Sequence, residues 1–91
     1  MRTLKVTGNA GSDQTFGPLC LRKIRPANVL AGAVTIKRGA TVIETLPVGM
    51  NPNATPPANH RQYGDTTFDA TTGLLVLNLA NGADVVLVSY S

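Results

Sequence analysis

The sequence is poor in the residue types that build catalytic, metal and disulfide sites. Its 91 residues include one cysteine, one histidine and no tryptophan, and only 14% of them are charged. Cys20 alone cannot form an intrachain disulfide, and its flanking leucines indicate a buried thiol rather than a nucleophile. The opening Met-Arg-Thr-Leu-Lys-Val lacks the apolar run of a secretion signal, and no stretch approaches a membrane span. We therefore expect synthesis in the cytoplasm and no membrane partner.

The titratable residues form no recognisable reaction centre. The five acidic residues are dispersed singly, and the nearest pair, Asp65 and Asp69, would lie more than about 13 Å apart along a strand. His60 has no acidic residue within four positions, which is typical of a histidine in a surface loop. These absences predict a protein that is not an enzyme and that needs no cofactor or metal.

The net charge of +3 comes from basic residues that gather in two short runs. Nucleic-acid binding is not expected, because no aromatic residue lies within a basic run to stack on bases. An acidic protein surface is a better match for such runs. The candidates for docking on it are Arg22, Lys23, Arg25, Lys37 and Arg38.

Short runs of Val, Leu, Ile and Thr alternate with turn residues, and no helical period of useful length occurs. The pattern predicts one all-β domain over residues 1–91, a small antiparallel β-sandwich or jelly roll of seven or eight strands. Strands are expected at 3–7, 18–25, 33–36, 41–46, 66–69, 74–79 and 84–90, with an additional short one near Tyr63.

The last two of these strands predict a β-hairpin about Asn81-Gly82, a pair that suits a type I′ turn. Its register would pair Leu77 with Val86 and leave both faces of the hairpin apolar. One face would carry Leu75, Leu77, Val86, Val88 and Tyr90, and the other Leu74, Val76, Val85 and Leu87. A strand pair that is apolar on both faces either sits centrally in a sandwich or carries a subunit contact on its outer face, and the second set supplies the candidates for a contact in a homo-oligomer.

A second hairpin is predicted between 33–36 and 41–46, with Gly39 in its turn. Loops of two or three residues pair Val34 with Ile43 or with Val42 respectively, and both registers remain open. The proline-rich stretch 47–59 that follows should be irregular. The candidates for a contact site in and after this loop are Asn53, His60, Arg61 and Tyr63.

Several runs together resemble small β-sandwich virion proteins of tailed bacteriophages, of the capsid decoration or cement type. The runs are GPLCLRKI at 17–24, AVTI at 33–36, TVIETLPVG at 41–49, YG at 63–64, TF at 67–68, GLLV at 73–76 and DVVLVSY at 84–90. The resemblance implies a protein that binds the outer surface of the assembled head and stabilises it. It implies a trimer or other small homo-oligomer, with the major capsid protein as partner and the virion exterior as location. The alternatives are a carbohydrate-binding tail or fibre module and another head or neck component.

Overall fold

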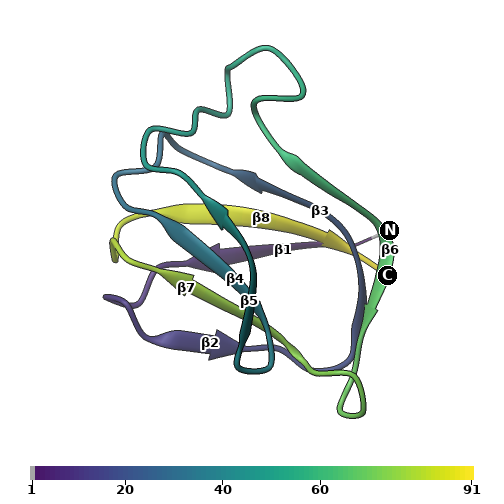
Figure 1. Ribbon diagram of the computed structural model, residues 1–91. Coiled ribbons are helices and arrows are strands. Elements are labelled where there is room, and N and C mark those ends of the chain that lie inside the picture. Colours follow the sequence, from purple (N-terminus) through teal and green to yellow (C-terminus); the bar gives the residue numbers. More distant parts are fainter. Residues whose placement is uncertain (1) are drawn as a thin grey trace.

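A computed structural model describes residues 2–91, which form eight antiparallel β-strands and no helix (Figure 1). The prediction of a small all-β sandwich is confirmed. The strands are β1 (Arg2–Thr7), β2 (Asp13–Thr15), β3 (Leu19–Pro26), β4 (Val34–Arg38), β5 (Thr41–Leu46), β6 (Arg61–Phe68), β7 (Leu75–Leu79) and β8 (Val85–Tyr90). The three-residue β2 is a strand that the sequence does not predict. Residues 47–59 contain no strand, as predicted.

The strands form two four-stranded sheets, sheet A in the order β1-β8-β3-β6 and sheet B in the order β2-β7-β4-β5. The pairs β4·β5, β3·β6, β2·β7 and β1·β8 lie at increasing distances along the chain from the β4–β5 turn. Such nesting describes a long hairpin that has been rolled up, which brings β3 beside β8 and β4 beside β7. This is the topology of a jelly roll.

The core lies between the two sheets and is made of aliphatic side chains around Phe68. The inward-facing residues of β7 and β8 are fully buried, as their alternation predicts: Leu75, Leu77, Leu79, Val86 and Val88. Leu21, Ile24, Val34, Ile36 and Leu46 complete the fully buried strand positions.

The β4–β5 hairpin forms as predicted, but neither expected register is correct. Gly39 and Ala40 make a two-residue loop, and a bulge at Ile43 shifts the pairing so that Val34 lies opposite Leu46. Gly39 has a φ of 59°, the backbone conformation that this position of a tight hairpin turn requires. The bulge disrupts the regular hydrogen-bonding edge of β5.

The predicted C-terminal hairpin is wrong, because β7 and β8 lie in different sheets. The amide of Asp84 donates to the carbonyl of Asn81 at 3.1 Å, and the amide of Ala83 donates to the Asn81 side chain at 2.9 Å. Asn-Gly therefore marks a turn, but one that carries the chain across the sandwich. Each strand thereby gains a hydrogen-bonded neighbour on both edges, which a two-stranded hairpin would not supply.

Asp84 fastens the β7–β8 connection to the neighbouring β3–β4 connection. Its carboxylate is buried and accepts hydrogen bonds from the amides of Ala31 and Gly32 at 2.9–3.1 Å and from Asn28 Nδ2 at 3.0 Å. Asn28 Oδ1 accepts in turn from the amide of Val85 at 2.8 Å. Burial acts to raise the pKa of Asp84, but the hydrogen bonds outweigh it and hold this pKa below its ordinary value.

The β1–β2 connection packs against the same place. The amide of Gly8 donates to the Asp84 carbonyl at 2.8 Å. A Cβ at Gly8 would overlap the carbonyl oxygen of Asn81, and one at Gly32 would lie 2.9 Å from the Asn81 nitrogen. Three connections thus meet backbone to backbone at one end of the sandwich, with glycine where they approach most closely.

Replacing Asp84 tests this arrangement. We expect Asp84→Ala to lower the free energy of unfolding by about 3 kcal/mol, because shielded amides lose their bonds to a charged acceptor. Urea denaturation followed by circular dichroism measures the change. Thr45→Ala, at an exposed position, is the control and should change stability by less than about 0.5 kcal/mol. Equal stability of Asp84→Ala and the wild type would contradict the assigned role.

The charge of Asp84 makes the same contact sensitive to acid. A carboxyl whose pKa is lowered by folding contributes stability above its unfolded pKa, near 3.8, and loses it as the pH falls through the folded value. The stability difference between the wild type and Asp84→Asn should therefore be full at about pH 6 and shrink below about pH 4. Denaturation of both proteins across this range measures it. A difference that does not vary with pH would show that the negative charge is not what the amides recognise.

Candidate functional site

The outer face of sheet A carries basic side chains on both sides of Leu87. Val86 and Val88 point into the core, so Leu87 between them points outward. Paired residues of an antiparallel sheet share a face, and the register places Lys5 of β1 and Arg25 of β3 beside Leu87.

A second outward row runs parallel to the first across sheet A. Ser89 lies between Thr3 of β1 and Lys23 of β3, and Lys23 lies opposite Gln62 of β6. Lys5, Lys23 and Arg25 thus share one face with small, neutral or apolar neighbours. We call this surface the basic face.

The cations of the basic face have no acidic partner among residues 2–91. Residues 2–91 contain three ion pairs, none of which involves a cation of the basic face: Arg22–Asp65 at 3.4 Å, Lys37–Asp13 at 3.1 Å and Arg61–Glu44 at 3.4 Å. Arg38 lies 4.1 Å from the centre of the Phe68 ring and donates to the carbonyl of Thr67 at 2.9 Å. The cations left without an ion pair in this part of the chain are Arg2, Lys5, Lys23, Arg25 and Arg38, of which Arg38 makes the ring and carbonyl contacts just described.

The five docking candidates predicted from the sequence therefore do not form one surface. Lys23 and Arg25 lie on the basic face, whereas Arg22 lies at a β-bulge of β3 and binds Asp65 on β6. Lys37 and Arg38 belong to β4 in the other sheet, so they cannot join the same surface. Sequence reasoning missed Lys5, because only the pairing of β1 with β8 brings it there.

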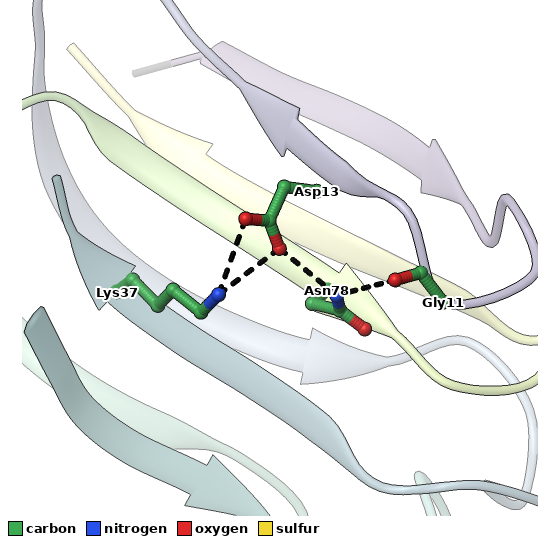
Figure 2. A network of polar contacts seen from close by, with 4 residues as sticks. All are labelled: Gly11, Asp13, Lys37 and Asn78. Carbon is green, nitrogen blue, oxygen red and sulfur yellow. Dashed lines mark hydrogen bonds and ion pairs between the residues drawn. The ribbon is translucent and has the colours of Figure 1, made fainter. Parts of the chain in front are cut away.

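The outer face of sheet B is electrically balanced. Lys37 of β4 donates to both oxygens of Asp13 on β2 at 3.1 Å (Figure 2). Asn78 of β7 lies with this pair and donates to Asp13 at 2.9 Å and to the carbonyl of Gly11 at 2.6 Å. The hydrogen bond from Asn78, followed by that from Lys37, lowers the pKa of Asp13. We call this surface the neutral face.

The subunit-contact candidates are divided between the two outer faces. Leu74 and Val76 lie at the neutral face, and Val85 and Leu87 point outward from sheet A. They were predicted to share one surface because β7 and β8 were read as a hairpin. They cannot form a single contact, since the sandwich separates them.

Two of the four loop candidates, Arg61 and Tyr63, come together at the open side of the sandwich between β5 and β6. Glu44 accepts a hydrogen bond from the Tyr63 hydroxyl at 3.1 Å and lies 3.4 Å from Arg61. His60 Nδ1 lies 2.6 Å from the Asn59 side-chain oxygen. Burial, and then the negative charge of Glu44, raise the pKa of Tyr63 well above its usual range.

This polar cluster closes the edge between the sheets rather than forming an open site. The Tyr63 ring packs partly buried against the core, so its face is not presented for stacking on a sugar. Asn53, the fourth loop candidate, is exposed and makes its own contact, donating its amide to Asn51 Oδ1 at 2.8 Å.

Within residues 2–91, no group of three or more His, Cys, Asp or Glu residues is placed to hold a metal. The same residues include no helix long and apolar enough to cross a membrane. Comparison with known proteins gave no match to a family model, a curated protein or a solved structure.

The unequal charge of the faces is measurable by cation-exchange chromatography. Neutralising the basic face with Lys5→Gln, Lys23→Gln and Arg25→Gln should lower the eluting salt concentration strongly, because these cations are uncompensated. The control is a second triple variant, which combines Arg22→Gln, Lys37→Gln and Arg61→Gln. It removes the same charge, but from residues in ion pairs, and should lower the eluting salt concentration less. Circular dichroism must confirm that both triple variants fold. Equal shifts would show that the charge is not polarised.

Proposed function

We propose that this protein is a structural component of a bacteriophage virion that binds the outer surface of the assembled head and stabilises it. The observation that carries the proposal is the basic face, on which Lys5, Lys23 and Arg25 surround Leu87 without an acidic partner among residues 2–91. The partner is the major capsid protein, through an acidic patch on its outer surface. The resemblance of the sequence runs to capsid decoration proteins supplies the setting.

The chemistry of the basic face supports a protein partner. Leu87 provides an apolar contact, and the surrounding cations steer and orient an acidic surface without needing a deep pocket. A nucleic-acid surface is a poorer match, because the outward rows contain no aromatic side chain to stack on bases. A stabilising protein of this kind acts by binding the assembled state more tightly than its separate parts.

Co-sedimentation with purified, expanded phage heads tests the proposal. We expect saturable binding with a fixed copy number per head, and binding that weakens as salt is added. Lys23→Gln with Arg25→Gln should weaken it at least tenfold, since two charge contacts are lost at the centre of the face.

The control variant Thr55→Asp with Ala58→Asp changes the net charge by the same amount in the exposed loop after β5. It should bind heads as the wild type does. Failure of the wild type to bind heads, together with binding to tails, glycans or DNA, would reject the proposal. Equal loss in both double variants would show that net charge acts, and not the basic face.

A further inference from the structure

The two outer faces differ in whether they can meet a copy of themselves. Two basic faces would place uncompensated cations opposite one another, which is unfavourable. The charges at the neutral face are Asp13 and Lys37, and they neutralise each other within the chain (Figure 2). Glu44 and Arg38 point away, toward Tyr63 and Phe68 of sheet A. A contact between copies is therefore favoured at the neutral face.

One row of side chains crosses the neutral face from edge to edge. The register places Thr15 of β2, Val76 of β7, Lys37 of β4 and Val42 of β5 side by side. Val42 is 55% exposed, and its neighbour Ile43, at the bulge, is 41% exposed. The row thus ends in a pair of exposed aliphatic side chains.

The opposite end of this row borders a shallow pocket of about 530 Å³. Its lining is largely small or apolar: Asp13, Thr15, Gly39, Ala40, Ala70, Gly73, Leu74 and Val76. A volume of this size accommodates two aliphatic side chains. The surface therefore carries an apolar projection and an apolar recess of matching chemistry.

We propose that the occupant of this pocket is Val42, with Ile43, from a second copy of this chain. A two-fold axis running between β7 and β4, along the strands, sets Thr15 of one copy opposite Val42 of the other. The same axis sets Lys37 of one copy opposite Val76 of the other, and the Lys37 ammonium stays on Asp13 of its own chain. Each copy donates a projection and receives one, as a two-fold contact requires.

The area of the neutral face limits how tightly two copies can bind each other. The molecule measures 34 × 26 × 19 Å, so even its broadest face barely reaches the roughly 800 Å² per partner of a standard interface. We therefore expect dimers that dissociate in the micromolar range and that tolerate salt, because the contact is apolar and uncharged overall.

Sedimentation equilibrium over a range of concentrations tests the contact. The wild type should reach the mass of a dimer, and Val42→Arg should remain a monomer. Val48→Arg and Val29→Arg alter equally accessible valines, 64% and 53% exposed, outside the face and should still dimerise. A wild type that stays monomeric at about 1 mM, a trimer, or equal loss of dimer in all three variants overturns the proposal.

A disulfide between copies tests the two-fold geometry directly. Thr15→Cys and Val42→Cys are made in separate chains, each with Cys20→Ser, and mixed under mild oxidation. Within one chain these positions lie three strand spacings apart, about 14 Å, which no disulfide spans. We expect a covalent dimer in the mixture and much less with either chain alone. Equal cross-linking in all three samples, or none, contradicts the axis. Head binding uses the other face, so either proposal can fail without the other.

Discussion

The buried carboxylate of Asp84 accepts hydrogen bonds from backbone amides that the jelly-roll topology leaves without a strand partner. Every connection except β4–β5 carries the chain from one sheet to the other, so the residues of these crossings lie outside the strand pairing. The amides in these crossings still need acceptors, because an unpaired amide shielded from water is costly. Asp84 accepts from Ala31 and Gly32, and Gly8 donates to its carbonyl. One residue therefore joins three crossings at one end of the sandwich.

The sequence predicts which side chains of one strand share a face, because they alternate. It does not predict which strands pair when they lie far apart in the chain. Leu75 was correctly grouped with Leu77, and Val86 with Val88, because side chains of a strand alternate whatever strand lies beside it; the two pairs are buried on the inner faces of different sheets. The hairpin about Asn81 was wrong because Asn-Gly encodes a turn and not the sheet that receives the next strand. The short β2 was not predicted because its three residues are all polar, follow turn residues and pair only with the distant β7.

The candidate site shows the same division. Lys23 and Arg25 are two residues apart on β3, so alternation alone indicates a shared face. Lys37 and Arg38 are adjacent, and alternation indicates that they point to opposite sides, as observed. Nothing local in the sequence pairs Lys37 with Asp13 or brings Lys5 to Leu87, because these contacts arise from strand register across the roll. Composition thus reveals how much charge is present, and topology decides where it acts.

Separation of charge between two faces has a consequence for the order of assembly. A contact made by uncompensated cations forms quickly by electrostatic attraction and weakens with salt, whereas an apolar, balanced contact is slower to form and tolerates salt. In the proposed decoration role, chains at low concentration would reach an acidic shell through the basic face first. Because the two faces lie on opposite sides of the sandwich, a copy bound through its basic face would turn its neutral face away from the shell, where a second copy could join it through the two-fold contact. The weak affinity expected between free copies would leave most chains monomeric when they reach the shell.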